Sequence, residues 1–377
     1  MKHSTLNNNN IRIIIAGGGT GGHIFPAIAV AQAIQQLRPN AELLFIGATG
    51  KMEMEKVPQA GYKIIGLTIA GFNRANILKN ISLPFKLVKS FFQVRSIFKN
   101  FKPNAVFGVG GYSSFPVLKY AQTLGIPNFI HESNAFAGKS NQWLGKNATM
   151  VFTGTKGMEV FFPIDKIMVT GNPVRKNIVE EGYSKENALL NFGLSLSKKT
   201  VLIIGGSLGA ASINKAIMKN LSLFFEGNIQ LIWQTGKPNA SEYEKAAESY
   251  PNVYTNTFID DMSAAYTAAD IVISRSGAMA VAEICLKGKA CVFVPYPHAA
   301  EDHQTFNAKL LVNDEAALMV KDSEVNEKLV PLVLDTLKDE PCLRKLQTNI
   351  KTFSIMNADQ VIAQKMIEIV ESNIKTN

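Results

Sequence analysis

Two segments of this chain begin in the same way, with an apolar strand, a glycine-rich loop and an amphipathic helix. The first reads IRIIIAGGGTGGHIFPAIAVAQAIQQL (residues 11–37), and the second reads TVLIIGGSLGAASINKAIMKNL (residues 200–221). Their loops lie 188 residues apart, counted from Gly17 to Gly205. Alternating strands and helices build parallel sheets covered on both faces, and 377 residues are enough for two domains. We therefore predict an α/β fold with two Rossmann-like domains whose parallel sheets face each other across a cleft.

Further β-rich runs extend both halves of the chain. The predicted strands are residues 42–47, 104–110, 126–132, 148–154 and 166–171 in the first half, and 228–236, 253–259, 270–277 and 291–297 in the second. The polar stretch 171–187 is the predicted linker, so the domains are expected to span residues 1–174 and 175–356. The amphipathic residues 357–377 form a last helix that can pack on either domain, and we expect it to pack back on the first.

Charge is unevenly distributed along the sequence. Residues 1–176 contain 20 lysines and arginines against 6 acidic residues, and residues 177–377 contain 19 against 24, which together give the net charge of +9. The first half is therefore expected to meet an anionic ligand or surface. Nucleic acid, phospholipid and a pyrophosphate substrate all fit this feature alone.

Residues 71–102 concentrate this basic character, with seven cations, no acid and many large apolar side chains. A crossover helix with one core face accounts for part of the pattern. The phenylalanines exceed what one core face needs, and cations gain about 1 kcal/mol each near an anionic bilayer. We therefore expect contact with an anionic membrane surface. Nucleic acid is disfavoured as a partner because no helix-turn-helix, zinc finger or aromatic RNA-binding motif accompanies the charge.

The loop GGGTGGH (residues 17–23) formally matches the dinucleotide fingerprint G-x-G-x-x-G. A nicotinamide site also needs an acidic residue at the end of the second strand, and that strand ends FIGATGK, with no acid before Glu53. The glycines instead allow backbone N–H groups and a helix N-terminus to approach an anion. His23 falls in the first helical turn, where it either packs locally or faces a bound diphosphate.

Two other loops of the first half follow neighbouring strands. GVGGYSS (residues 108–114) contains Tyr112, and HESN (residues 131–134) contains Glu132 and Asn134. Because the carboxyl ends of parallel strands meet at one edge of a sheet, we expect these loops to converge with the first glycine loop.

The second half offers a matching set of polar loops. GGSLGA (residues 205–210) is a second anion loop, in which Ser207 adds a hydroxyl group. SRSGAMAVAE (residues 274–283) reads as a loop entering a helix, where Arg275 and the helix N-terminus favour phosphate. Glu283 can accept two hydrogen bonds from a ribose diol, although an ordinary surface glutamate fits the same pattern. PYPHAAEDHQTFNA (residues 295–308) adds groups such as Gln304 that suit a sugar.

Several classes of protein are disfavoured by what the sequence lacks. No run of 18 apolar residues or secretory leader occurs, and the three cysteines show no paired spacing, which together favour the cytoplasm. The five histidines have no metal-ligand spacing, so no metal is expected. A non-catalytic basic scaffold explains the charge but not the second glycine loop with Glu283.

The motifs GGTGGH, GGY-S, HE-N, GNPVR, GGS-GA, FIDDM, SRSGA-----E and EDHQ--NA occur in this order between residues 11 and 370. They resemble the MurG family of bacterial N-acetylglucosaminyltransferases, which convert the first lipid-linked peptidoglycan precursor into the second. The resemblance implies the glycosyltransferase B fold, UDP-N-acetylglucosamine as donor and undecaprenyl-diphospho-N-acetylmuramoyl-pentapeptide as acceptor. The acceptor 4-hydroxyl attacks the anomeric carbon with inversion, and no cofactor is implied.

The resemblance also implies a location and a set of partners. The protein is expected to be peripheral, on the cytoplasmic face of the bacterial inner membrane. Other proteins of cell-wall synthesis are further expected partners.

Individual residues receive roles by the same motif match. The second domain is expected to hold the donor, with Glu283 on the ribose hydroxyls and the backbone of Ile259 on uracil. Arg175 is expected to bind the donor diphosphate, Arg175 or Arg275 is expected to stabilise the departing UDP, and Tyr112 is expected to face the acceptor diphosphate. The remaining implied substrate-binding residues lie in the glycine loops, the helix after residue 277 and the sugar site, and are Thr20, Gly21, Gly22, Asn134, Ser207, Ala278, Met279, Ala280, Val281, Ala282 and Gln304.

An inverting displacement needs a base for the acceptor hydroxyl. His23 is the predicted base, because its reference pKa near 6.5 suits the task and it adjoins the glycine loop, and Glu132 is the reserve. The family often has glutamine at the positions of Ser133 and Thr305, so contacts to the sugar are expected to differ there. The alternative function is that of another two-domain UDP-sugar enzyme, a 2-epimerase or a transferase to a different acceptor.

Overall fold

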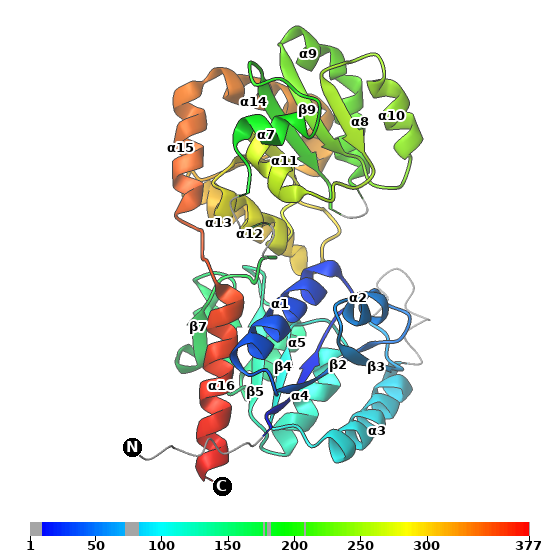
Figure 1. Cartoon of the computed structure of the whole chain (residues 1–377), viewed down its shortest axis with the longest axis vertical. Coiled ribbons are helices and arrows are strands. Elements are labelled where there is room, and N and C mark those ends of the chain that lie inside the picture. The colour runs from blue at the N-terminus through cyan, green and yellow to red at the C-terminus, as the bar shows by residue number, and fades with distance from the viewer. Residues whose placement is uncertain (1–9, 72–82, 176–177, 179–181, 207–208, 377) are drawn as a thin grey trace. The chain divides into compact units, whose positions relative to one another are not determined.

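The computed structural model describes residues 10–71, 83–175, 178, 182–206 and 209–376 (Figure 1). They divide into two compact units, each described here by itself. Unit 1 comprises Met1–Ser133, Ala137–Pro173 and Asn357–Asn377, and unit 2 comprises Asn134–Phe136 and Val174–Met356. Each unit contains one sheet whose strand pairs are all parallel, as predicted for an α/β fold of two Rossmann-like domains.

The sheet of unit 1 has seven strands in the order β3-β2-β1-β4-β5-β6-β7. Their bounds are β1 Arg12–Ala16, β2 Glu42–Ala48, β3 Lys63–Leu67, β4 Ala105–Gly108, β5 Asn128–Glu132, β6 Met150–Thr153 and β7 Ile167–Val169. In the interior strand β1, Ile15 pairs with Phe45 of β2 on one side and with Phe107 of β4 on the other. Strand β3 was not predicted; it is an edge strand whose residues are mostly exposed or half-buried, so it lacks an apolar run.

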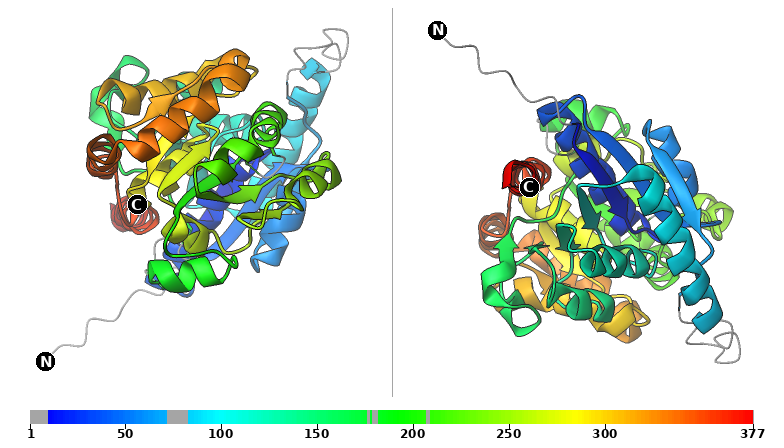
Figure 2. Two further views of the ribbon diagram at one scale, coloured as in Figure 1. Left: turned by 90° about the horizontal axis from the view of Figure 1, so that it is seen from above. Right: turned by 90° about the horizontal axis from the view of Figure 1, so that it is seen from below.

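Helices cover both faces of this sheet (Figure 2). Ile13 and Ile15 of β1 join the core under α1 (Gly21–Leu37) and α16 (Ala358–Thr376), whereas Ile14 joins the opposite core. That opposite core lies under α3 (Leu83–Phe101) and α4 (Ser114–Thr123). The period-two alternation of a strand therefore sends its apolar side chains into two different cores.

The last helix, α16, packs along α1 within unit 1 (Figure 1). Its buried face includes Ile362, Met366 and Val370, and an ion pair joins Arg38 to Glu371 at 2.7 Å. Burial of each such side chain stabilises the packing by about 1.5–3 kcal/mol, so the apolar stripe of this helix contributes more than the exposed ion pair. The end of the chain is thereby held in the first unit.

The sheet of unit 2 has six strands in the order β10-β9-β8-β11-β12-β13. Their bounds are β8 Lys199–Ile204, β9 Ile229–Gln234, β10 Val253–Asn256, β11 Ile271–Ser274, β12 Ala290–Phe293 and β13 Leu318–Met319. The two-residue strand β13 was not predicted, and β10 ends at Asn256 rather than at residue 259.

Helices also cover both faces of the second sheet. One core lies under α7 (Lys185–Leu190), α11 (Met262–Ala268), α12 (Ala278–Lys287) and α13 (His303–Asn313). The other lies under α8 (Ala211–Lys219), α9 (Leu221–Glu226), α10 (Ala240–Ala247), α14 (Val325–Lys338) and α15 (Glu340–Lys351).

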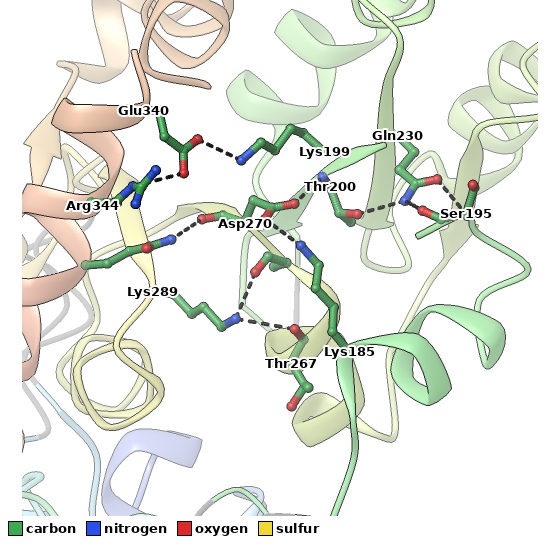
Figure 3. A network of polar contacts seen from close by, with 12 residues as sticks. Lys185, Ser195, Lys199, Thr200, Gln230, Thr267, Asp270, Lys289, Glu340 and Arg344 are labelled. Atoms are coloured by element: carbon green, nitrogen blue, oxygen red, sulfur yellow. Dashed lines mark hydrogen bonds and ion pairs between the residues drawn. The ribbon is translucent and has the colours of Figure 1, made fainter. Parts of the chain in front are cut away.

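A polar network ties together the amino ends of β8, β11 and β12 (Figure 3). Asp270 accepts hydrogen bonds from Thr200 N at 2.8 Å and from Lys185 Nζ at 2.5 Å. Lys289 Nζ donates to the carbonyls of Thr267 and Ala269, and burial lowers the pKa of this lysine to about 8. The network lies at the end of the sheet opposite the loops predicted to bind ligands.

The predicted linker spans the change from unit 1 to unit 2 after Pro173. Of its 17 positions, residues 176–177 and 179–181 lie outside the described residues, and α7 begins at Lys185. No helix among the described residues is long and apolar enough to cross a membrane.

Candidate active site

The loop between β1 and α1 starts the site in unit 1. Helix α1 begins at Gly21, with Thr20 as an extended N-cap residue, so Gly21, Gly22 and His23 form its first turn as predicted. Loops after β1, β4 and β5 leave the same edge of the sheet, because these three strands are neighbours. The loops after β1 and β4 are in contact, since Gly18 N donates to the Gly110 carbonyl at 3.4 Å, whereas Asn134–Phe136 of the loop after β5 belong to unit 2.

The ring of His23 lies between two of these loops. Its Nδ1 atom is 3.1 Å from the carbonyl oxygen of Gly18, and a Cβ built on Gly110 would lie 3.0 Å from its Nε2 atom. A carbonyl oxygen only accepts hydrogen bonds, so this contact assigns the proton to Nδ1. In the neutral ring Nε2 is then the nitrogen with the lone pair, which is the form that a general base requires.

Tyr112 is half-buried in the loop after β4. Its ring lies against Gly71, where a built Cβ would be 2.8 Å from the ring. Burial, and after it the charge of Glu53, raises the pKa of the Tyr112 hydroxyl, so the phenol stays protonated at neutral pH. A neutral phenol can donate a hydrogen bond to a phosphate oxygen.

Glu132 is only 3% exposed, and its carboxylate is hydrogen-bonded to the loop that follows it. Its Oε2 atom accepts hydrogen bonds from Gly138 N at 3.0 Å and from Asn141 Nδ2 at 2.8 Å, at the start of α5 (Lys139–Gly145). This is the geometry of a carboxylate that holds a loop in place. It argues against Glu132 as the reserve base.

His131 is fully buried next to it. Its Nε2 atom donates to the carbonyl of Gly171 at 3.3 Å, and its Nδ1 atom is 3.3 Å from Ser133 Oγ. Burial, opposed by the hydrogen bond to the Gly171 carbonyl and aided by the charge of His23, lowers the pKa of His131 to about 4. His131 is therefore neutral at physiological pH.

In unit 2, Glu283 lies on the second turn of α12 with its side chain 10% exposed. Its Oε1 atom is 3.5 Å from Arg175 Nη2, and its Oε2 atom accepts a hydrogen bond from the Tyr266 hydroxyl at 3.1 Å. Burial raises the pKa of Glu283, and the nearby Arg175 and Tyr266 partly offset this effect. A buried carboxylate with these partners is not an ordinary surface glutamate.

Ile259 follows β10 and is 3% exposed. Its N–H donates to Gln234 Oε1 at 3.0 Å, and Gln234 Nε2 donates to the Gly206 carbonyl at 3.2 Å. Gln234 therefore braces the backbone predicted to meet uracil against the second glycine loop. Ser207, in that loop, lies outside the described residues.

Arg275, predicted to bind phosphate, contacts several loops of unit 2. Its guanidinium donates to Asp322 Oδ1 at 2.6 Å, to Ser212 Oγ at 2.9 Å and to the carbonyls of Val294 and Pro295. These contacts join the segments after β8, β11 and β12. Arg275 is thus placed to hold the loops of unit 2, and Arg175 is the arginine that lies beside Glu283.

The predicted sugar contacts gather around α13. Gln304 Oε1 accepts from Tyr296 N at 2.9 Å. Asn307 Nδ2 donates to Asn134 Oδ1 at 3.2 Å, and Asn307 Oδ1 accepts from Ala135 N at 2.8 Å. Residues 134–136 accordingly belong to unit 2, although they follow β5 in the chain. Ala278, Met279, Ala280, Val281 and Ala282 form the half-buried first turns of α12 after its N-cap residue Gly277.

Sequence reasoning missed Tyr266, Gln234 and the support that Glu53 gives the first glycine loop. The only available signal was a polar residue at the end of a buried strand, which applies to Gln234. Among the described residues, no group of three or more His, Cys, Asp or Glu side chains is arranged to hold a metal ion.

Both halves of the chain match known domains. Residues 13–153 match the glycosyltransferase family 28 N-terminal domain, and residues 200–365 match the glycosyltransferase family 28 C-terminal domain. A relative from Bacteroides thetaiotaomicron is 50% identical over 96% of this chain and 98% of its own length. A relative from Phocaeicola vulgatus is 49% identical over 98% of this chain and 99% of its own.

Both relatives are named UDP-N-acetylglucosamine–N-acetylmuramyl-(pentapeptide) pyrophosphoryl-undecaprenol N-acetylglucosamine transferase. The crystal structure of Acinetobacter baumannii MurG is similar to this chain with a TM-score of 0.77 and 29% identity, over 95% of this chain and 99% of that one. The matched residues fall in both units. The chain belongs to glycosyltransferase family 28 and, within it, to the MurG family, with the glycosyltransferase B fold.

Proposed function

We propose that the protein transfers N-acetylglucosamine from UDP-N-acetylglucosamine to the 4-hydroxyl of lipid-linked N-acetylmuramoyl-pentapeptide, with inversion at the anomeric carbon. The observation that carries this proposal is the 50% identity, over nearly the whole chain, to a relative named for that transfer. The shared name favours transfer over the alternatives of 2-epimerisation or a different acceptor. The product is the second lipid-linked precursor of peptidoglycan.

Unit 2 holds the donor in this proposal. The Glu283 carboxylate accepts hydrogen bonds from the two ribose hydroxyls, and Tyr266 and Arg175 orient it and oppose the effect of burial on its pKa. Arg175 and the N–H groups at the start of α12 stabilise the charge that develops on departing UDP. Residues of this chain therefore stabilise the leaving group, UDP, as the bond to the sugar breaks.

His23 removes the proton from the acceptor hydroxyl as that oxygen attacks the anomeric carbon. The Gly18 carbonyl holds the Nδ1 proton, so Nε2 is the atom that accepts the substrate proton. The new bond joins the acceptor oxygen to the anomeric carbon on the face opposite the departing UDP oxygen. The bond to UDP breaks, and the configuration changes from α to β.

The acceptor carries a lipid that is held in the membrane. Unit 1, which binds the acceptor in this proposal, therefore needs a surface that contacts the membrane. On α3, Phe85, Val88 and Phe92 are 77%, 56% and 68% exposed, and their i, i+3, i+7 spacing places them in one stripe. Lys86, Lys89, Arg95 and Lys99 belong to the same helix. We assign this stripe to the anionic cytoplasmic face of the inner membrane, where the protein acts as a peripheral enzyme. Other cell-wall synthesis proteins are its expected neighbours there.

The direct test is UDP release from UDP-N-acetylglucosamine with and without a short-chain lipid-linked muramoyl-pentapeptide. The proposal predicts release that depends on the acceptor and is matched by formation of a disaccharide. Donor binding without acceptor-dependent release would mean that the acceptor is wrong. Absence of donor binding would overturn the nucleotide-sugar assignment itself.

A further inference from the structure

Glu53 is a buried acid in unit 1 to which none of these roles applies. It begins α2 (Glu53–Gln59) and is 1% exposed. Its Oε2 atom accepts a hydrogen bond from Gly19 N at 2.9 Å, and its Oε1 atom accepts one from Ala48 N at 2.9 Å. The carboxylate therefore joins the loop after β1 to the last residue of β2.

The glycine loop is shaped around this carboxylate. A Cβ built on Gly18 would lie 2.4 Å from the carboxyl group of Glu53, and one built on Gly47 would lie 2.4 Å from its Cγ atom. Gly18 also has φ of +147°, which side chains rarely adopt. Any side chain at Gly18 or Gly47 would therefore clash with Glu53. Glu53 also occupies the N–H of Gly19, which a substrate anion could otherwise have used.

One peptide group connects Glu53 to His23. The N–H of Gly19 donates to Glu53, and the carbonyl of the same peptide unit, that of Gly18, accepts from His23 Nδ1 at 3.1 Å. A planar trans peptide directs its N–H and C=O to opposite sides, so fixing one group fixes the other. Hydrogen bonds in such a chain also polarise one another.

We propose that Glu53 is a positioning residue that acts on His23 through the Gly18–Gly19 peptide. It fixes the direction of the Gly18 carbonyl, which in turn fixes the orientation of the imidazole and keeps its proton on Nδ1. The arrangement resembles the carboxylate that orients histidine in hydrolytic triads, with a peptide group interposed. The inference rests on the proposed function only in assigning catalytic work to His23.

The chemistry requires a carboxylate rather than an amide. Two N–H groups converge on the two oxygens of Glu53, whereas the Glu53→Gln side chain offers one acceptor oxygen and an NH₂ group that cannot accept. One of Gly19 and Ala48 then loses its partner, and the loop relaxes. Glu53→Asp keeps both acceptors on a stem shorter by one methylene. Glu55→Gln is the matched control, because Glu55 lies on the same helix with 66% of its side chain exposed.

The first experiment measures the ring nitrogens of the five histidines by ¹⁵N NMR near pH 8, with His23→Ala to assign the signal. We expect the Nδ1–H tautomer of His23 in the wild type and in Glu55→Gln, and a mixed or Nε2–H tautomer in Glu53→Gln. A wild-type tautomer in Glu53→Gln overturns the proposal. This readout needs no turnover, so its failure is distinguishable from failure of the proposed transferase activity.

The second experiment separates kcat from KM. Glu53→Gln is expected to lower kcat about 10- to 100-fold, with KM for the donor within about twofold, because a displacement near 1 Å of a catalytic group costs about that much. Glu53→Asp is expected to retain more activity than Glu53→Gln, which a loss of folding alone does not predict. Circular dichroism and thermal unfolding of each variant check that unit 1, which contains Glu53, is folded. Unchanged kcat in folded Glu53→Gln contradicts the proposal. If Glu53→Gln does not fold, the comparison uses Glu53→Asp, and a lowered kcat in that variant with a wild-type His23 tautomer contradicts the proposal.

Discussion

The hydroxyl of Tyr266 donates a hydrogen bond of 3.1 Å to Oε2 of Glu283, from a position at which both side chains are buried. Burial, and after it the charge of Glu283, raises the pKa of Tyr266 well above its usual value of 10, so the phenol remains a donor at any physiological pH. The carboxylate in turn needs such donors, because burial alone favours its protonated form. The Tyr266 hydroxyl therefore orients Glu283 and opposes the effect of burial on the pKa of this carboxyl group.

Tyr266→Phe removes this donor without changing the shape of the core. We expect KM for UDP-N-acetylglucosamine to rise about 3- to 10-fold with kcat nearly unchanged, because a hydrogen bond to a charged group contributes about 1.5–3 kcal/mol and water can replace part of it. Steady-state kinetics measures the effect. Tyr243→Phe, which removes the same atom in the opposite core of unit 2, is the control. Equal KM values in the two variants would contradict the role of Tyr266.

His23→Ala tests the assignment of the base. Turnover should fall about 10²- to 10⁴-fold, the usual contribution of general acid–base catalysis, while UDP-sugar binding by unit 2 stays within about twofold. Single-turnover kinetics and calorimetric titration measure the two quantities separately. Turnover near the wild-type value would show that His23 is not the base.

Acid should destabilise unit 1 through His131. Its pKa is about 4 in the folded protein and near 6.5 when unfolded, so the unfolded chain binds the extra proton between these values. The stability that the neutral histidine contributes is complete above pH 6.5 and is lost as pH falls toward 4. At pH 5 the loss is about 2 kcal/mol relative to pH 8.

His131→Gln removes that titration. Urea denaturation at pH 8 and pH 5 should show a smaller pH-dependent loss in the variant than in the wild type, whatever its stability at pH 8. If both proteins lose the same free energy of unfolding between these pH values, His131 is not responsible for the acid sensitivity.

The exposed stripe of α3 predicts membrane binding. Replacing Phe85 and Phe92 by serine should weaken binding to phosphatidylcholine vesicles that contain phosphatidylglycerol by about 100-fold or more, since each buried aromatic side chain contributes about 1.5–3 kcal/mol. Co-sedimentation measures the change. Phe225→Ser is the matched control, because Phe225 is 50% exposed on α9 of unit 2. Vesicle binding by the double variant equal to that of Phe225→Ser would exclude this surface.

The fold could be predicted because strands buried on both faces leave apolar runs, as in β1 and β8, and because glycines and helix starts follow them. Strand β3 was missed because its exposed and half-buried positions carry lysine, glycine and isoleucine in no clear pattern, and β13 is only two residues long. Motifs identified Glu283 and His23 by type and position.

The partners of these residues could not be predicted. Tyr266 precedes Glu283 by 17 positions on another helix, and Glu53 follows Gly19 by 34 positions on α2. Such pairings depend on how helices cross a sheet, which sequence spacing does not specify. The partner of Arg275 could not be predicted either. This motif arginine, next to a helix N-terminus, donates a hydrogen bond to Asp322, 47 positions later.

The most direct test of the proposed reaction is the anomeric configuration of its product. Wild-type protein is incubated with UDP-N-acetylglucosamine and a short-chain lipid-linked muramoyl-pentapeptide, and the disaccharide is analysed by proton NMR. A displacement assisted by one base predicts a β-linked N-acetylglucosamine on the 4-hydroxyl, in amounts equal to the UDP released. An α-linked disaccharide, or release of UDP without any disaccharide, would contradict the mechanism.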